Sequence, residues 1–276
     1  MNTLSGIDPV AAIASSGLHP RVVHNWITQY RLAEHTLIPW LRREGVLTDG
    51  ASIAEIGCAE GGVLMACAEV THGYALGTDI QGELLSLYSS DIARRVGLDI
   101  TFTQHDVIYE DVPAEWEHRF EVVLLRDVLE HLDDTFVALR NIRRLLKPGG
   151  ILLITFPPYT SAFGGHQQLL ETAAGKLPFV HMLPRPMFEQ IIRGSSSINT
   201  DEVRRLASIR LSAERVRKAA RREDYELVDE RYFMLRPVFK WKYKEWIPTL
   251  DVTSIKHLPG IQQLAMEAAF LLRRPL

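Results

Sequence analysis

Acidic residues at the ends of successive predicted strands are the groups in this sequence best suited to bind a ligand. The stretch from Ile53 to Gly62 predicts a short buried strand, a glycine-rich turn and the start of a helix. Such a turn lets the backbone approach a ligand closely, because glycine has no side chain. Glu55 lies two residues before Gly57, at the strand end, where a carboxylate suits a cationic ligand better than an anionic one.

Three later segments of β-rich character also end in an acid. The first ends in Asp79, which is placed to accept the two hydroxyls of a ribose, and the third ends in the pair Arg126 and Asp127. The carboxyl ends of parallel strands meet at one edge of a sheet, so these groups are expected to lie close together. The segments are 74–80, 100–107 and 120–127, with the acids Asp79, Asp106 and Asp127.

Elements of two kinds must position these acids. From residue 55 to 156, predicted strands alternate with helices, which indicates an α/β fold with a doubly wound, mostly parallel sheet. A helical region over 21–44, interrupted at Pro39, precedes the first strand, and a helix capped by Asp133 precedes the fifth. One long basic helix is predicted over 201–222. The remaining strands are expected at 151–156, 225–235 and 267–272.

In this order the motifs resemble the class I (Rossmann-like) S-adenosylmethionine-dependent methyltransferases. The resemblance covers about residues 50–157 and includes Glu130-His131-Leu132 and the run 146–150. Ala59 stands where the family usually has its middle glycine. The resemblance implies seven strands, with the last running antiparallel between strands five and six. The cofactor residues that it implies are Glu55, Gly57, Cys58, Ala59, Gly61, Asp79, Ile80, Asp106, Val107, Arg126 and Asp127.

Within that cofactor site, the resemblance assigns the glycine turn to the methionine part of S-adenosylmethionine. It assigns Asp79 to the ribose and Asp106 with Val107 to the adenine, and it places Arg126 and Asp127 beside the methionine end. The acid on the first strand suits the sulfonium and ammonium charges of this cofactor.

The chain is expected to form a single methyltransferase domain with an insertion. An N-terminal arm and helices occupy 1–48, the arm being a loose segment over residues 1 to about 19, and the cofactor-binding core follows over 49–157. Prolines and aromatics are frequent over 158–200, which predicts a lid over a substrate pocket. The last helix and strands six and seven fill 201–276.

Two histidines are candidates for catalysis. Displacement at a sulfonium methyl needs an aligned nucleophile and, for a hydroxyl, a proton acceptor. His166 lies just after the fifth strand, either turned into the pocket or hydrogen-bonded to the loop backbone, and His131 either shapes the cofactor wall or takes part in catalysis. Glu130 is either a base or, as preferred here, a solvated or helix-capping carboxylate. The histidines and cysteines show no metal-ligand spacing, so no metal site is expected.

Charge and composition limit the classes of partner that the chain is expected to bind. The net charge of −3 gives no general attraction to nucleic acid, and no apolar run reaches the ~20 residues needed to span a membrane. Arginines gather over 201–222, which fits either a solvated helix face or a phosphorylated small molecule such as a sugar nucleotide. Two cysteines at no framework spacing indicate a reducing cytoplasm. The sequence does not specify the oligomeric state.

The preferred hypothesis is O-methylation of a sugar or secondary metabolite. The segment around His166 resembles that of bacterial methyltransferases from surface-polysaccharide and natural-product pathways. Gly57-x-Ala59-x-x-Gly62 also loosely fits a dinucleotide fingerprint, so a nucleotide-cofactor oxidoreductase stays open. A non-catalytic member of the methyltransferase fold is the third alternative.

Overall fold

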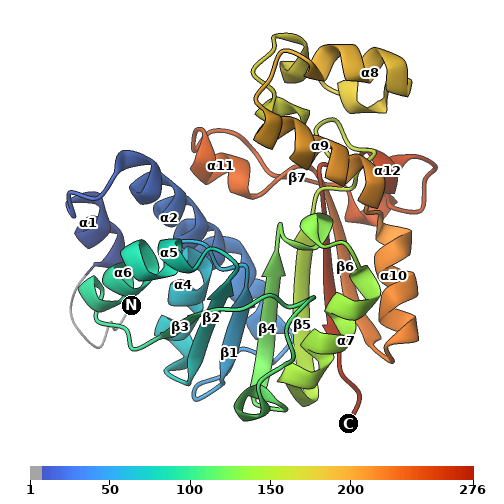
Figure 1. Cartoon of the computed structure of the whole chain (residues 1–276). Coiled ribbons are helices and arrows are strands. Elements are labelled where there is room, and N and C mark those ends of the chain that lie inside the picture. Colours follow the sequence, from blue (N-terminus) through green and yellow to red (C-terminus); the bar gives the residue numbers. More distant parts are fainter. Residues whose placement is uncertain (1–7) are drawn as a thin grey trace.

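The computed structural model describes residues 8–276, which fold around one twisted sheet (Figure 1). Its strand order is β3-β2-β1-β4-β5-β8-β6-β7. The first five strands run parallel, and β8 runs antiparallel between β5 and β6, as predicted. The strands are β1 Ile53–Ile56, β2 Ala75–Asp79, β3 Thr101–Gln104, β4 Phe120–Arg126, β5 Leu146–Phe156, β6 Glu226–Leu235, β7 Leu250–Asp251 and β8 Glu267–Arg273.

The sheet has eight strands where seven were predicted. The additional strand is β7, which pairs antiparallel with β6 at the sheet edge. It lies in the segment 236–263, which the sequence predicts as a loop. A strand of two residues has no alternation of polar and apolar positions, so a sequence pattern does not reveal it.

Helices cover both faces of the sheet, as a doubly wound fold requires. The α-helices are α1 Pro9–Ala14, α2 Pro20–Leu32, α3 Ile38–Arg43, α4 Gly62–Thr71, α5 Gly82–Leu84, α6 Ser90–Arg95, α7 Thr135–Leu145, α8 Arg185–Ile192, α9 Ser197–Ile209, α10 Ala213–Arg222, α11 Val238–Lys242 and α12 Ile261–Leu264. Helices α7 and α10 pack on one face, and α1 to α4 with α6 pack on the other.

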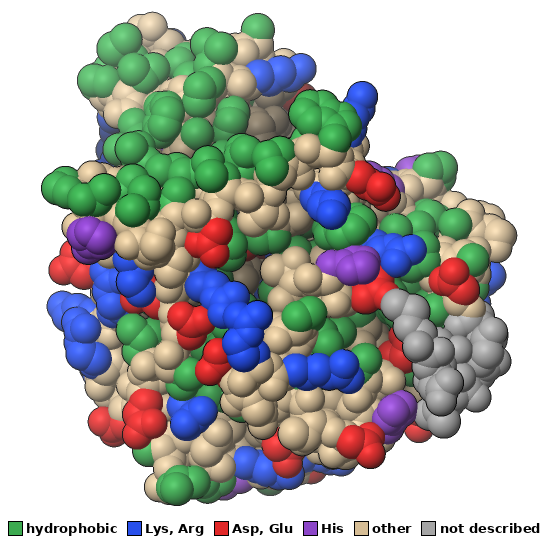
Figure 2. Space-filling model, turned by 180° about the vertical axis from the view of Figure 1, so that it is seen from behind, with side chains coloured by type: hydrophobic (Ala, Val, Ile, Leu, Met, Phe, Trp, Pro, Cys, Tyr) green, Lys and Arg blue, Asp and Glu red, His purple; other side chains and the backbone are tan. Residues whose placement is uncertain are grey.

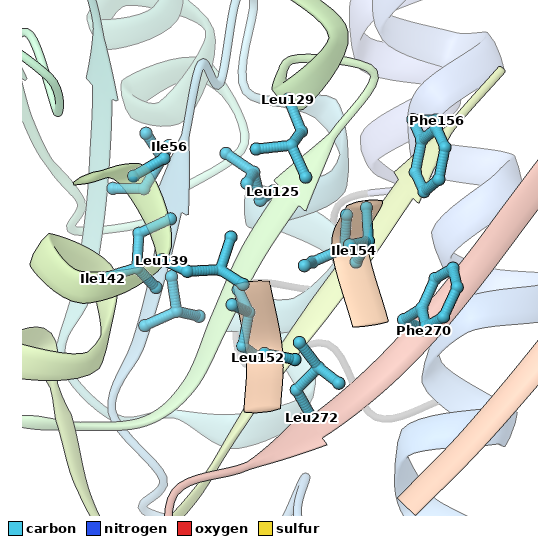
Figure 3. Packing of buried hydrophobic residues seen from close by; sticks show 14 of the residues in the cluster. Ile56, Leu125, Leu129, Leu139, Ile142, Leu152, Ile154, Phe156, Phe270 and Leu272 are labelled. Carbon is cyan, nitrogen blue, oxygen red and sulfur yellow. The ribbon is translucent and has the colours of Figure 1, made fainter. Parts of the chain in front are cut away.

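Strand β4 contributes alternate side chains to the hydrophobic cores on the two faces of the sheet. Val123 and Leu125 face α7, and Val122 and Leu124 face the opposite layer, all fully buried. A strand buried on both faces is a continuous apolar run, and this is what the sequence has at these positions. Figure 3 shows Leu125 in the layer where side chains of β5 and α7 meet.

The N-terminal segment is more ordered than the predicted loose arm. Residues 9–14 form helix α1, whose first turn is capped by the Asp8 carboxylate. Ile13 is fully buried and joins the core around α2. A short apolar helix of this kind gains its stability from packing, which the sequence window alone does not show. Residues 1–7 of the predicted arm lie outside the described residues.

The predicted long helix over 201–222 is two helices. Helix α9 ends at Ile209, and Arg210 adopts a left-handed φ of 48°. Helix α10 then starts anew, with the Ser212 hydroxyl accepting a hydrogen bond from the Arg215 N–H. A left-handed residue followed by a serine N-cap is a common helix break, and here it reorients α10 onto the sheet.

The segment after β5 is an insertion with a small core of its own. Five buried residues form this cluster, and in Figure 1 helices α8 and α9 stand above the strand ends. Hydrophobic side chains also gather on the outer surface of this part of the molecule (Figure 2). In residues 8–276 no helix is long and apolar enough to cross a membrane. The cluster consists of Leu170, Val180, Phe188, Ile192 and Val203.

Candidate active site

The turn between β1 and α4 has the backbone geometry expected of a ligand-binding loop. Gly57 has a φ of +70°, and a side-chain carbon there would lie 2.4 Å from the Cγ2 atom of Val128. Gly61 has a φ of +79°. Ala59, at the family's glycine position, also adopts a positive φ, of 45°. An alanine therefore occupies the turn in the conformation that glycine favours.

Asp79 ties the tip of β2 to this turn. Its Oδ2 atom accepts the Ala59 N–H at 3.0 Å, and its Oδ1 atom accepts the Gln81 N–H at 3.0 Å. Each carboxylate oxygen has a further lone pair. The carboxylate is therefore fixed in place with acceptor capacity left over, and the side chain of Ile80 beside it is 62% exposed.

Glu55 has a structural partner. Its carboxylate accepts the Leu64 N–H at 3.0 Å, in the first turn of α4. Burial raises the pKa of Glu55 to about 8, against the opposing charge of Arg126. The group is thus a buried cap of α4, and its expected contact with the cofactor stays a prediction.

Asp106 organises the loop after β3. Its Oδ1 atom accepts the N–H groups of Ile108 at 2.8 Å and Tyr109 at 3.2 Å. Val107 is buried, and its carbonyl accepts a hydrogen bond from Asn141 on α7. This loop lies next to the tip of β2, because β2 pairs with β3. Their assignment to the adenine stays a prediction.

Arg126 and Asp127 join the tip of β4 to its surroundings. The Arg126 guanidinium donates to Thr155 on β5 and to Gln29 on α2. Burial alone would raise the pKa of Asp127, but the charges of Arg236 and Arg126 hold it below its usual value. Arg236 donates to Asp127 and to the buried Glu267 on β8.

Beyond Asp127, the structure brings together both histidines expected to act in catalysis. The imidazoles of His131 and His166 have ring centroids 5.0 Å apart. The Oε1 atom of Glu130 lies 3.9 Å from the Nε2 atom of each. His131 also hydrogen-bonds Glu202 on α9 through its Nδ1 atom. We call Glu130, His131 and His166 the polar cluster.

Burial dominates the electrostatics of the polar cluster. Burial and the charge of Asp127 raise the pKa of Glu130 to about 8. Burial and the neighbouring His131 lower the pKa of His166 to about 4. Burial would lower the pKa of His131 too, but its bond to Glu202 and the charge of Glu130 raise it.

The interpretation of Glu130 as a solvated or helix-capping carboxylate is wrong. The residue is 2% exposed, and no group in residues 8–276 hydrogen-bonds either of its carboxylate oxygens. It follows β4, and His166 of the loop after β5 lies 3.9 Å from its Oε1 atom. A sequence pattern does not reveal this burial, because that neighbour lies far along the chain.

A cavity of about 190 Å³ opens beside the polar cluster. His166 lines it, together with Arg236 after β6 and aromatic side chains of α11 and its end. The sequence predicts 236–263 as an aromatic loop that lines either the pocket or a dimer contact. In the structure it contributes to the wall of this cavity. The lining residues are Pro157, Ser161, Phe163, His166, Gln168, Arg236, Phe239, Lys242, Tyr243 and Met266.

Sequence reasoning missed four residues of this region. Gln29 orients Arg126, Glu202 holds His131, Arg236 holds Asp127, and Lys242 lines the cavity. They come from three helices and a loop, at positions with no motif. The sequence offers the arginines of 201–222 as possible ligand contacts. In the structure several of them pair with acids of the chain itself, such as Arg205 with Asp133.

The comparisons agree with this architecture. Residues 54–152 match the family described as "Methyltransferase domain". The ubiquinone biosynthesis O-methyltransferase of Caulobacter vibrioides is 33% identical over 106 residues, which are 38% of this chain and 40% of that protein. Phosphoethanolamine N-methyltransferase 1 of Triticum aestivum is 30% identical over 40% of this chain and 21% of its own length.

The match to curated relatives thus spans two fifths or less of the length of these two. Among solved structures, an S-adenosylmethionine-dependent methyltransferase from Mesorhizobium loti superposes with a TM-score of 0.51 at 18% identity, over 86% of this chain and 96% of that one. The [4+2]-cyclase SpnF superposes with a TM-score of 0.53 at 17% identity, over 87% and 80%.

These two structural likenesses establish the fold alone, because identity is low. The family match falls on β1 to β5, which are the strands whose tips carry Asp79, Asp106 and Asp127. Fold, domain match and ordered motifs together make residues 54–152 of this chain similar to the methyltransferase domain of class I (Rossmann-like) S-adenosylmethionine-dependent enzymes.

Proposed function

We propose that this chain transfers the methyl group of S-adenosylmethionine to a small-molecule hydroxyl. The main observation is that the turn after β1 has small residues in left-handed conformations and is hydrogen-bonded to the carboxylate of Asp79. The turn lies beside the tip of β4, because β1 pairs with β4. The cofactor lies across these tips, with its ribose on Asp79 and its adenine against Asp106 and Val107. Its methionine end lies toward Arg126.

The acceptor enters the 190 Å³ cavity. Phe163, Phe239 and Tyr243 supply flat apolar walls, which suit a ring. Lys242 adds positive charge, although burial lowers its pKa, whereas Arg236 is already paired with Asp127 and Glu267. These walls support a ring-bearing acceptor with an anionic group, a class that includes acidic secondary metabolites and sugar nucleotides.

Oxygen is the proposed acceptor atom. The polar cluster faces the cavity through His166, where a hydroxyl of the acceptor meets it. We assign His166 and His131 to this contact, as the groups that position the hydroxyl and favour loss of its proton. The O-methyltransferase relative supports oxygen, whereas the N-methyltransferase relative makes nitrogen the alternative, and mass spectrometry of the methylated product distinguishes them. The buried thiols of Cys58 and Cys67 support a reducing cytoplasm as its location.

Calorimetry tests the cofactor site directly. Titration with S-adenosylhomocysteine should show one site, and Asp79→Ala should weaken binding by roughly 1–3 kcal/mol, because the ribose hydroxyls lose a buried acceptor. Asp111→Ala removes an exposed carboxylate on the loop after β3 and serves as the control. Equal affinity in both variants would show that Asp79 does not hold the ribose.

A second candidate is a member of the fold that binds the cofactor but catalyses another reaction. The [4+2]-cyclase, with the same fold, motivates it. Incubation of acceptor mixtures with isotopically labelled S-adenosylmethionine separates the two functions. A labelled methyl group on one compound, detected by mass spectrometry, supports transfer. Tight binding without any labelled product would support the second candidate, and affinity for NADH would favour the oxidoreductase alternative.

A further inference from the structure

The polar cluster has an arrangement that the proposed cofactor contacts do not explain. Glu130, His131 and His166 each offer one ligand atom, and all three atoms lie within 4.8 Å of one another. Both carboxylate oxygens of Glu130 are buried without a hydrogen-bond partner among the described residues. A buried polar atom in this state costs about 1–3 kcal/mol, so a partner for it is expected.

We propose that the polar cluster binds one divalent transition-metal ion. A metal ion held by imidazole nitrogen or carboxylate oxygen lies about 2.0–2.2 Å from each, so two ligands of a tetrahedral site are about 3.4 Å apart. The distances from Glu130 Oε1 to the two imidazole Nε2 atoms, 3.9 Å each, need to close by about half an ångström to reach that spacing. They are too long for hydrogen bonds. All three ligand atoms lie within 4.8 Å of one another, so the two imidazoles need to approach by at most about 1.4 Å.

The surroundings already orient the ligands. The Nδ1 atom of His131 is bonded to Glu202, which leaves its Nε2 atom facing the cluster. A carboxylate behind a ligating histidine is the usual support of a metal site. Asp127 adds negative charge close by, and its Oδ1 atom is buried with no hydrogen-bond partner in the described part of the chain.

The backbone at His166 adds an independent observation. This residue has a φ of 50°, the left-handed region, although it is not a glycine. Such strain persists only where the surroundings impose it, and it concentrates at functional sites. Here it places the imidazole of the insertion against the residues that follow β4. The insertion thereby completes a ligand set begun by the core.

The donor set selects the kind of metal. Two imidazoles with one carboxylate suit Zn²⁺, Mn²⁺, Fe²⁺ or Co²⁺, whereas Mg²⁺ and Ca²⁺ prefer oxygen ligands. Spacing along the sequence predicts no metal site, because folding brings His166 to Glu130 and His131 from a distant part of the chain. If the proposed methyl transfer holds, a cation beside the cavity would lower the pKa of an approaching hydroxyl. Metal binding itself does not depend on that reaction.

Cobalt titration tests the site without any assay of activity. The full-length chain, stripped with a chelator, should bind one equivalent of Co²⁺ and develop visible d–d absorption. Glu130→Gln and His166→Ala should abolish this absorption, and Glu202→Gln should weaken binding by about 10–100-fold, because it removes the support of His131. Zn²⁺ should displace Co²⁺, whereas Mg²⁺ in tenfold excess should not.

Two variants provide matched controls. His24→Gln and Glu115→Gln remove an exposed histidine and an exposed glutamate elsewhere, and both should bind Co²⁺ like the parent chain. Circular dichroism confirms that each variant is folded. The proposal is overturned if the parent chain shows no d–d absorption up to about millimolar Co²⁺, or if the control and cluster variants bind alike. Binding of S-adenosylhomocysteine, measured on the same samples, reports separately on the proposed function.

Discussion

At the scale of single residues, acids at neighbouring strand tips have different tasks. Asp79 is fixed by two backbone N–H groups and retains lone pairs for a ligand. Glu55 is buried more deeply and accepts a bond from the first turn of α4. The sequence predicts a cofactor contact for both, and their hydrogen-bond partners distinguish them in the structure.

The buried position of Glu55 predicts a pH dependence of stability. Its pKa is about 8 in the folded chain and about 4.3 in the unfolded chain, so the folded state holds the extra proton between these values. Its contribution to stability is complete below about pH 4 and is lost as the pH rises through 8. The difference in unfolding free energy between the parent chain and Glu55→Gln should therefore fall from pH 5 to 9.

Urea denaturation at several pH values measures that difference. The Gln side chain retains an oxygen for the Leu64 N–H and has no charge, so it removes this titration alone. Other buried acids, such as Glu267, titrate in both proteins and cancel in the subtraction. A difference that is constant over the range would show that Glu55 titrates normally in the folded chain.

A pair of glycines separates backbone strain from crowding. Gly57 and Gly50 have similar φ values, +70° and +76°, so alanine at either costs about 1–2 kcal/mol. A Cβ atom at Gly57 would also collide with Val128, which adds about 1–3 kcal/mol, whereas among the described residues nothing lies within 4 Å of one at Gly50. Gly57→Ala should therefore lower the unfolding free energy more than Gly50→Ala. Equal losses would contradict the close approach.

At the scale of elements, helix starts depend on single side chains. The sequence predicted Asp133 as the N-cap of the helix before β5, but Asp134 is the cap. Its Oδ1 atom accepts the Phe136 and Val137 N–H groups. Asp133 instead pairs with Arg205 and Tyr109 on the surface. Adjacent aspartates fit the capping pattern equally well, so only the observed backbone distinguishes them.

This difference between neighbours gives a prediction for α7. Asp134→Ala should lower the unfolding free energy by about 0.5–2 kcal/mol, because two N–H groups lose their acceptor. Asp133→Ala should cost about 0–1 kcal/mol, because it breaks an exposed ion pair. Denaturant titrations of the two variants provide the comparison. A larger loss of unfolding free energy for Asp133→Ala than for Asp134→Ala would show that Asp134 is not the cap.

At the scale of the whole molecule, two extensive cores enclose the sheet, and a third, small one stabilises the insertion. Five buried residues between 170 and 203 make up that cluster. The insertion nevertheless places His166 beside Glu130, and the adjoining helix α9 places Glu202 beside His131. A segment with a small core thus lies beside the site proposed here for the acceptor.

We therefore expect the insertion to open independently. Amide hydrogen exchange should give residues 170–200 an opening free energy at least ~2 kcal/mol below that of β4 and β5, because few buried contacts hold the segment. S-adenosylhomocysteine together with an acceptor should slow this exchange. Equal protection of the insertion and the central strands would show that the molecule unfolds as one unit.

The sequence alone determined the succession of strands one to five along the chain, the helices between them and the acids at the strand ends, whereas the order of the strands in the sheet came from the structure. It could do so because short apolar runs, turn glycines and caps are local signals. The resemblance supplied the antiparallel last strand, which the structure confirms. Local patterns placed helix ends less well, as the break at Arg210 shows.

Only the tertiary structure decided what surrounds Glu130. Its neighbour His166 comes from the loop after β5, and Glu202 on α9 holds the adjacent His131, so both lie far away in sequence. Burial and proximity between distant segments depend on packing of the whole chain, and no window of sequence contains them. The polar cluster, the cavity beside it and the shifted pKa values of its members are therefore properties of the folded molecule.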